Sequence, residues 1–432
     1  MFKKAKCGIW LLIFLLPLFS YGEVESVKVG GEISVRGIWW KNMDLQGKEY
    51  QVDQWLDSTV RLNISADLTE NVGVFFSLIN ERDWNVEGDG TVNPENSSDV
   101  ELDLAYLKLE KLWDSDFSVI IGRQELIYGE AFLLGANPEA PCPIHYPYGA
   151  RVGFDAVKVN YSFTPWSVDF FKAKISEGYG KGDDENLYGI NAHLSQKGEW
   201  DFAFLTKTQN PPEEGKNETY ALSIRGEGEI PQFKGLSVKG EIVKEWGKIA
   251  KDAIDTGYPE KCVSRQALGG YLGINYTVDN PYSPYFGITY IYESGDKNAD
   301  KKDGRIESFD PFYEDETFGI IADGGVSDYL DTSSNKIIWV SNFGFAPAEK
   351  VSLDLSYYSY RLAEAEYNSS GEKTSKDAGY EWDITLSYEY SEDVNFSFWY
   401  AYFHPGKYFE DMYGEDYEKN AEELGFSLTV SF

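Results

Sequence analysis

Four oxygen-bearing side chains in one stretch have a spacing that suits metal binding. Asp296, Asn298, Asp300 and Glu307 stand at the first, third, fifth and twelfth positions of a run with the ligand spacing of an EF-hand calcium loop. The sixth position, where such a loop needs glycine for its turn, is Lys301. A regular EF-hand is therefore not expected. The choice stays open between a looser calcium site and a solvated acidic loop.

Residues for acid–base catalysis are scarce in this chain. It contains three histidines, His145, His193 and His404. His193 lies two residues before Ser195, but such a pair does not by itself form a catalytic triad. No group of histidines and cysteines has the spacing of a transition-metal site. We therefore expect no enzyme, and no cofactor apart from the calcium ion considered above.

The N-terminal residues resemble a secretory signal. Lys3, Lys4 and Lys6 precede an apolar run at 8–19, and small residues for cleavage follow at 20–22. The apolar run has 12 residues, too few for a membrane-spanning helix of roughly 20 residues. We expect a signal peptide at 1–22 and one domain at 23–432, with an uncleaved anchor as the alternative. Export allows Cys142 and Cys262, both in expected long loops, to form a disulfide, with unpaired thiols as the alternative.

Composition narrows the class of fold and of partner. The 432 residues carry 72 acidic and 39 basic side chains, a formal net charge of −33. Such a balance argues against nucleic acid as a partner. The chain also contains 31 Tyr, 26 Phe, 12 Trp and 41 Gly, without helical apolar runs. This composition favours an all-β protein.

Alternation of apolar and polar residues is the clearest pattern along the chain. In 380–390, Tyr, Trp, Ile and Leu share one parity, while Glu381, Asp383 and Thr385 share the other. The last residues, 424–432, alternate in the same way and end on Phe432. Successive side chains of a strand point to opposite faces, so each stretch predicts a strand with one apolar and one polar face. We count about 18 such strands.

The connections between these strands alternate between long and short. Long loops on one rim and short turns on the other are typical of a transmembrane antiparallel β-barrel. In a membrane barrel the apolar face points to lipid and the charged face lines water, whereas a soluble barrel would reverse this. We therefore predict an outer-membrane barrel with long outer loops and short periplasmic turns. The long connections are 42–53, 85–99, 124–153, 177–185, 208–218, 247–266, 295–335, 361–378 and 405–422.

The polar parity supplies candidate pore-lining residues, which are basic in the earlier strands and acidic in the later ones. We hypothesise a basic wall that faces an acidic wall, with charges that merely solvate a wide lumen as the alternative. The 30-residue loop 124–153 is predicted to fold into the lumen, held by Arg123 or Arg151, with an external loop as the alternative. The candidates are Arg36, Arg61, Arg123, Arg151, Lys158, Lys172, Lys174, Arg225, Lys239, Glu293, Asp354, Glu381, Asp383 and Glu389.

Three short stretches resemble the alginate-export-type family of outer-membrane porins. They are 121–130 (IGRQELIYGE) followed by 153–156 (GFDA), then 292–296 (YESGD) followed by 309–311 (FDP), and finally 381–384 (EWDI) leading to 402–409 (YFHPGKYF). The resemblance implies an 18-stranded barrel in the bacterial outer membrane, acting as a monomer. It also implies passage of hydrophilic solutes, in the best-known members an anionic polysaccharide.

The charges of this chain depart from the strongly basic lumen that such a substrate favours. The basic residue that the family pattern places near Phe132 is absent, and the candidate lining is mixed. We therefore expect a porin for diffusion or export of hydrophilic solutes, surrounded by outer-membrane lipid. The alternatives are a dedicated exporter of an anionic polysaccharide and a surface adhesin that uses the long acidic loops.

Overall fold

The computed structural model describes residues 26–47, 52–84, 100–135, 153–177, 184–209, 217–250, 262–297, 304–324, 326 and 334–432. Long strands dominate these ranges, and two short helices, α1 (Ile320–Asp323) and α2 (Lys407–Tyr413), follow β14 and β18. Among the described residues, no helix has the length and apolar character needed to cross a membrane. The strands are β1 (Ser26–Lys41), β2 (Val52–Thr69), β3 (Val72–Asp83), β4 (Glu101–Leu112), β5 (Phe117–Glu125), β6 (Gly153–Phe163), β7 (Trp166–Ser176), β8 (Glu185–Ser195), β9 (Glu199–Gln209), β10 (Asn217–Glu229), β11 (Leu236–Ala250), β12 (Cys262–Thr277), β13 (Tyr285–Glu293), β14 (Arg305–Ile306), β15 (Lys336–Ala348), β16 (Val351–Leu362), β17 (Asp377–Ser391), β18 (Val394–Pro405) and β19 (Ala421–Ser431).

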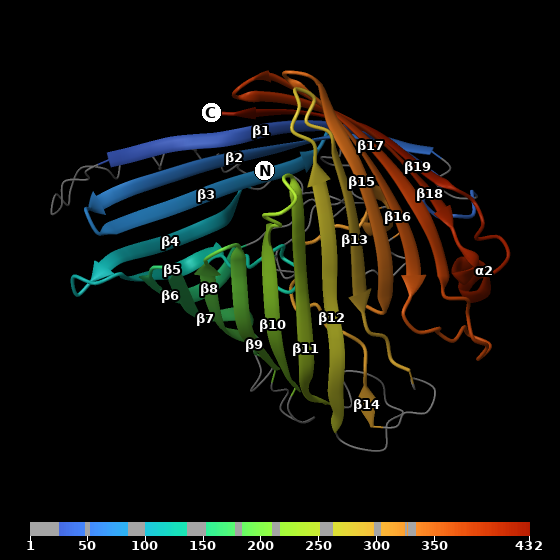
Figure 1. Ribbon diagram of the computed structural model, residues 1–432, viewed down its shortest axis with the longest axis horizontal. Coiled ribbons are helices and arrows are strands. Elements are labelled where there is room, and N and C mark those ends of the chain that lie inside the picture. The colour runs from blue at the N-terminus through green and yellow to red at the C-terminus, as the bar shows by residue number, and fades with distance from the viewer. Residues whose placement is uncertain are drawn as a thin grey trace, which may run out of the picture.

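The long strands form a single closed sheet (Figure 1). Each pairs antiparallel with its sequence neighbours, and β1 closes the ring by pairing with β19. The exception is β14, whose two residues pair parallel with β12 and do not belong to the wall. The wall therefore contains 18 strands, which confirms the predicted antiparallel barrel. After β19 the chain continues the seam, because the backbones of Gly31 and Phe432 exchange two hydrogen bonds of 2.9 and 3.0 Å.

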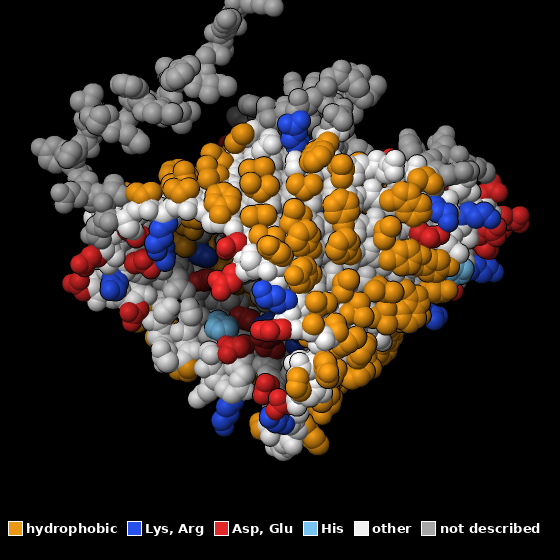
Figure 2. Space-filling view, turned by 90° about the horizontal axis from the view of Figure 1, so that it is seen from above, with side chains coloured by type: hydrophobic (Ala, Val, Ile, Leu, Met, Phe, Trp, Pro, Cys, Tyr) orange, Lys and Arg blue, Asp and Glu red, His pale blue; other side chains and the backbone are white. Residues whose placement is uncertain are grey.

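The two faces of the wall differ as the alternation predicts. On β17 the side chains of Trp382 and Ile384 are 41% and 43% exposed, while Glu381 and Asp383 are 0% and 6% exposed. Figure 2 shows hydrophobic side chains gathered over a broad area of the surface. Exposed apolar residues of this density suit a hydrocarbon surrounding, where a closed sheet leaves no unpaired edge. The apolar face therefore points outward and the charged face points into the barrel.

Connections between the strands alternate as the sequence predicts. Short turns such as Thr164-Pro165 between β6 and β7 lie at one rim, and long segments lie at the other. Parts of these long segments enter the barrel, and the hydrophobic core lies where they pack against the inner face of the wall. Phe132, Phe309 and Ile321 from loops are almost fully buried against wall residues such as Phe154 and Phe403. The interior is thus partly filled by apolar loop residues, in addition to the charges of the wall.

Candidate channel constriction

The segment after β5, residues 126–135, turns into the barrel and is called the first inner loop here. Leu126, Phe132 and Leu134 are at most 1% exposed. Gly129 and Ala131 adopt positive φ values of 62° and 61°, which lets the chain reverse tightly. A side chain at Gly129 would place its Cβ 2.6 Å from Cδ of Arg225. Glycine is therefore needed there, both for the backbone conformation and for close approach to the wall.

A carboxylate at the tip of the first inner loop binds the wall. Glu130 contacts Arg225 on β10 at 3.0 Å and also receives a hydrogen bond from Lys239 on β11. Burial raises the pKa of Glu130, but the bonds from Lys239 and Arg225 outweigh it and leave the pKa below the ordinary value. Arg225 also contacts Asp201 at 3.2 Å and Glu227 at 2.6 Å. The loop is thus anchored by a shared network of charges.

An aromatic residue provides a second anchor for the same loop. The hydroxyl of Tyr128 donates to Asp169 on β7 at 2.9 Å. Its ring stacks on Phe171 of the same strand, with centroids 5.5 Å apart. Because Asp169 and Phe171 alternate with the exposed Phe170, both point into the barrel. The first inner loop is therefore fixed to β7 as well as to β10 and β11.

A second inner loop, residues 307–324, pairs with the first. The backbone N–H of Gly135 donates to the carbonyl of Tyr313 at 2.7 Å, and that of Asp315 donates to Ala131 at 3.0 Å. The ring of Phe132 packs on Phe309 at 5.7 Å. Two loops far apart in sequence thus form one plug-like layer across part of the lumen.

Charged groups of the wall hold the second inner loop. Asp310 contacts Lys207 of β9 at 2.7 Å and Arg265 of β12 at 3.3 Å. Burial raises the pKa of Asp310, but these two cations outweigh it and lower the pKa below its ordinary value. Lys336 of β15 contacts Glu314 at 3.5 Å, and its ammonium lies 4.3 Å from the ring centre of Phe318. Three cations of the wall, Lys207, Arg265 and Lys336, thus hold the second inner loop through its carboxylates and the ring of Phe318.

The end of the second inner loop is held by carboxylates instead. Glu381 of β17 accepts hydrogen bonds from the backbone N–H groups of Ile321 at 2.6 Å and Ala322 at 2.9 Å. Asp383 accepts from the N–H of Ile320 at 3.2 Å. These are the first residues of α1, whose N–H groups have no partner within the helix. The acidic pair therefore accepts hydrogen bonds from buried backbone N–H groups that would otherwise have no partner.

Most basic residues of the inner face are ion-paired locally. Arg36 contacts Asp57 at 3.0 Å, and Arg61 contacts Asp103 at 3.2 Å. Lys336 contacts Glu293 at 3.2 Å. Most lysines and arginines of the inner face thus have an adjacent carboxylate, and no separate basic wall forms in the described part of the barrel.

Several inner carboxylates lack a cationic partner of this kind. Glu423 accepts from the indole N–H groups of Trp40 and Trp399, both at 2.6 Å. Asp354 accepts from the hydroxyl of Tyr285 at 2.6 Å. These donors are neutral and add no positive charge beside the carboxylates. The described lining is therefore acidic on balance.

A cavity of about 550 Å³ lies along the inner face of β2 to β6. Arg61, Asn63, Gln124 and Lys158 contribute polar groups to it. The stacked rings of Phe75 and Tyr106, with centroids 5.2 Å apart, contribute an aromatic surface. Lys158 contacts no carboxylate of the described residues. The cavity, which Ile127 of the first inner loop also lines, thus combines two cations with amides, rings and the carboxylates of Asp103 and Glu125.

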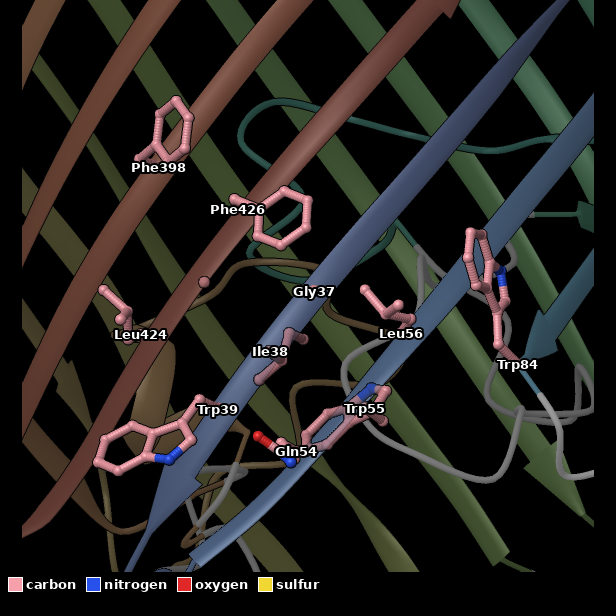
Figure 3. A pocket seen from close by; sticks show the side chains of 11 residues that line it. Gly37, Ile38, Trp39, Gln54, Trp55, Leu56, Trp84, Phe398, Leu424 and Phe426 are labelled. Carbon is pink, nitrogen blue, oxygen red and sulfur yellow. The ribbon is translucent and has the colours of Figure 1, made fainter.

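A different cavity, of about 630 Å³, lies outside the lumen at the seam of β1 and β19 (Figure 3). Its apolar wall is formed by outward side chains such as Leu56, Phe398 and Leu424. Gly37 makes the hollow, because a Cβ there would lie 2.3 Å from the ring of Phe426. The cavity belongs to the lipid-facing surface and takes no part in the constriction.

The structure places the predicted pore-lining residues in three groups. Arg151 lies outside the described residues. Three others lie on the outer face: Arg123, Lys172 and Lys174. The remaining candidates lie on the inner face: Arg36, Arg61, Lys158, Arg225, Lys239, Glu293, Asp354, Glu381, Asp383 and Glu389.

The outer placement of Lys172 and Lys174 corrects the sequence-based assignment. Both alternate with Phe171 and Ala173, which are 5% and 0% exposed because the first inner loop packs on them. Both parities of β7 contain apolar residues, so alternation alone did not reveal which one faces lipid. The parity with Phe170, which is 47% exposed, is the outer one.

Arg123 is corrected for a related reason. It pairs in register with Asp155 and contacts that carboxylate at 3.0 Å. Asp155 shares its parity with Val157, which is 45% exposed, so this ion pair lies on the outer face near the long-loop rim. The entry of the loop into the lumen agrees with the prediction, but Arg225 and Lys239 hold it. Its remaining residues, 136–152, lie outside the described part.

The calcium and disulfide predictions stay predictions. Asn298 and Asp300 lie outside the described residues, while Asp296 and Glu307 lie on either side of them. No group of three or more His, Cys, Asp or Glu in the described part is arranged to hold a metal ion. Cys142 also lies outside, and Cys262 opens β12.

The sequence missed five residues that hold the constriction: Glu130, Lys207, Arg265, Asp310 and Lys336. Glu130 and Asp310 stand inside the short family-like stretches 121–130 and 309–311, which is the signal that could have singled them out. Their partners on distant strands carry no such signal. Only closure of the barrel brings them together.

Comparison with known proteins gives a consistent result. The profile of the alginate export family matches residues 26–421. Pseudomonas aeruginosa OccK2 (OpdF), solved in complex with glucuronate, has a TM-score of 0.56 at 10% identity, covering 95% of this chain and 100% of that chain. Acinetobacter baumannii OccAB1 has a TM-score of 0.56 at 11% identity, covering 95% and 98%. A comparison with curated proteins finds no match.

The structural likeness, at 10–11% identity, shows the fold alone. The family match spans almost the whole described chain. Together with the closed barrel, the outward apolar face and the charged lumen, it identifies the chain as a member of the alginate export family, an outer-membrane channel for hydrophilic solutes.

Proposed function

We propose that this channel passes small hydrophilic solutes through a loop-narrowed lumen and prefers cations to anions. The observation that carries the proposal is the charge pattern of the lumen. Arg36, Arg61, Arg225 and Lys336 are each neutralised by adjacent carboxylates. Inner carboxylates such as Glu423 receive only neutral donors. An acidic, low-dielectric passage concentrates cations and repels anions.

The two inner loops narrow the lumen, which favours passage of a small solute over passage of a polymer. They are bonded to each other and to β7, β9, β10, β11, β12, β15 and β17. A long anionic chain would require either their displacement or passage beside them through an acidic lining. We propose further that one chain acts alone, because β1 and β19 close the lumen within a single polypeptide, and that it performs no catalysis.

Ion selectivity tests this proposal. The purified protein is inserted into planar bilayers under a gradient of KCl, and the reversal potential is measured. We expect the sign that corresponds to cation selectivity. Glu229→Gln together with Glu389→Gln, which remove two exposed carboxylates of the inner face near the short-turn rim, should move the reversal potential toward zero. Anion selectivity of the unmodified channel would contradict the proposal.

An acidic sugar is the second candidate solute, favoured by one observation. Lys158 has no carboxylate contact within the described residues and lines the cavity that contains the rings of Phe75 and Tyr106. A structure of similar fold, OccK2, was solved with glucuronate. Glucuronate added to one side of the bilayer should then reduce the single-channel current, and Lys158→Gln should weaken this block.

Lys108→Gln is the matched control for the glucuronate test. Lys108 lies on β4, outside the cavity lining, and is ion-paired with Glu110 at 2.8 Å. Equal block of the unmodified channel and both variants would leave Lys158 without a role in solute binding.

A further inference from the structure

His193 is the one histidine inside the barrel among the residues that the structure describes. It lies on β8 and pairs in register with Asp201 of β9. On β8 it alternates with outward residues such as Ile190, which is 42% exposed. The other described histidine, His404, pairs in register with Tyr380, which has the outward parity of β17. Histidine is the side chain that commonly changes charge between pH 5 and 8.

Both ring nitrogens of His193 contact carboxylates. Nε2 lies 3.0 Å from Oε2 of Glu199, and Nδ1 lies 2.9 Å from Oδ1 of Asp201. A neutral imidazole has one N–H group and one bare nitrogen, whereas a protonated imidazole has two N–H groups. Ionised carboxylates only accept hydrogen bonds. Both contacts are therefore hydrogen bonds only when His193 carries a positive charge.

These two carboxylates connect His193 to the constriction. Asp201 contacts Arg225 at 3.2 Å, and Arg225 holds Glu130 of the first inner loop at 3.0 Å. Glu199 and Glu130 line the same cavity of about 410 Å³. The turn between β8 and β9 also contributes to the lining of this cavity, which therefore lies toward the short-turn rim. His193 is thus placed between the first inner loop and the short-turn mouth of the lumen.

Each element around His193 contributes charged groups to the inner face. In this set, five carboxylates stand beside two cations other than His193, so the local charge is negative and a proton on His193 reduces it. The set consists of Asp169 from β7, Glu199 and Asp201 from β9, Arg225 and Glu227 from β10, Lys239 from β11 and Glu130 from the first inner loop.

The charge of His193 acts on ions in the lumen because the ring is accessible. Its side chain is 38% exposed, and that of Glu199 is 41% exposed. Loss of the proton removes one positive charge and leaves one carboxylate without its donor. A unit charge about 7 Å away in water changes the local concentration of a monovalent ion by roughly two- to three-fold. The protonation of one ring is therefore sufficient to change which ions enter.

We propose that His193 sets the charge selectivity of the channel according to pH. Protonation in acid weakens the preference for cations, and loss of the proton toward neutral and basic pH strengthens it. The inference rests on the proposed passage of ions through this lumen, and it names the residue that adjusts their selection. The register of β8 and β9 carries it, because that register brings two carboxylates to one imidazole.

Reversal potentials at two pH values test the proposal. The purified channel is inserted into planar bilayers under a gradient of KCl, and the reversal potential is read at a single conductance level at pH 5.5 and pH 8.0. At pH 5.5, His193→Gln should raise the ratio of potassium to chloride permeability roughly two-fold, because glutamine carries no charge. At pH 8.0 the two proteins should have the same ratio. His193→Lys, which keeps a positive charge, should instead lower the ratio roughly two-fold at pH 8.0 and leave it unchanged at pH 5.5.

His404→Gln is the matched control. His404 lies at the end of β18 near the long-loop rim, and its Nδ1 is 2.6 Å from the amide oxygen of Asn420. This variant should have the permeability ratio of the unmodified channel at both pH values. Equal single-channel conductance of the unmodified channel, His193→Gln and His404→Gln at pH 8.0 shows that each is folded.

Equal permeability ratios of the unmodified channel and His193→Gln at pH 5.5 would overturn the proposal. The failure of the proposed function has a different signature. A channel that prefers chloride at both pH values, but in which His193→Gln still raises the ratio at pH 5.5 alone, would refute the cation preference and support the role of His193.

Discussion

The ion pair between Glu130 and the wall is the contact most open to a direct test. In Glu130→Gln the loop loses its charge but keeps its size and one acceptor oxygen. Hydrogen bonds between charged groups contribute about 1.5–3 kcal/mol each. Glu130 is 28% exposed, and Arg225 keeps Asp201 and Glu227 as partners. We therefore use the lower part of this range and expect the free energy of docking of the loop to weaken by about 2 kcal/mol.

A loss of about 2 kcal/mol corresponds to a roughly 30-fold change in an equilibrium constant. The undocked state should become about 30-fold more populated, although Tyr128 and Phe132 still hold the loop. Single-channel recordings measure this population as time spent at a larger conductance. Glu229→Gln is the control, because Glu229 lines the same cavity of about 410 Å³ as Glu130 and lies outside the anchor. If both variants give the same distribution of conductance, the ion pair does not hold the loop.

The same anchor predicts a pH dependence. The pKa of Glu130 in the folded channel is lowered, chiefly because Lys239 and Arg225 outweigh the effect of burial. A lowered pKa stabilises the docked state above the pKa of a free glutamate, about 4.3. This stabilisation is lost as the pH falls through the lower, folded value. Opening of the loop should therefore begin only below about pH 4.3.

Three further predictions concern the same two loops. Gly129→Ala places a Cβ 2.6 Å from Cδ of Arg225 at φ 62°, so it should cost about 1–3 kcal/mol and raise the larger conductance as Glu130→Gln does. Phe132→Ala empties a site that is 0% exposed and should lower the free energy of unfolding by about 3–5 kcal/mol in urea titrations; a change below 1 kcal/mol would show that the ring is not packed. Burial raises the pKa of Glu316 to about 8, so docking of the second inner loop should weaken as the pH rises from about 4.5 toward 8, because only the undocked glutamate ionises freely there. In recordings at pH 6 and pH 9, Glu316→Gln should remove this difference, and its persistence would exclude Glu316 as the cause.

The two faces of β7 show what the alternation of residues in a strand does not reveal. Phe171, Ala173 and Ile175 form an apolar parity that by itself predicts contact with lipid, and Lys172 and Lys174 then appear as pore residues. The first inner loop reverses this, because it gives Phe171 and Ala173 an apolar partner inside the barrel. Alternation reports that two faces differ, whereas the identity of each face depends on what covers it.

The amino-acid sequence alone predicted the barrel, its number of strands and its family. These properties follow from local information: a period of two residues within each strand, turn lengths between strands, and short family-like stretches. Tertiary structure decided the constriction, because Glu130 meets Arg225 across 95 residues and Asp310 meets Lys207 across 103 residues of the chain. It also decided how charge is distributed in the lumen, because a carboxylate from another strand offsets the electric field of the cation beside it.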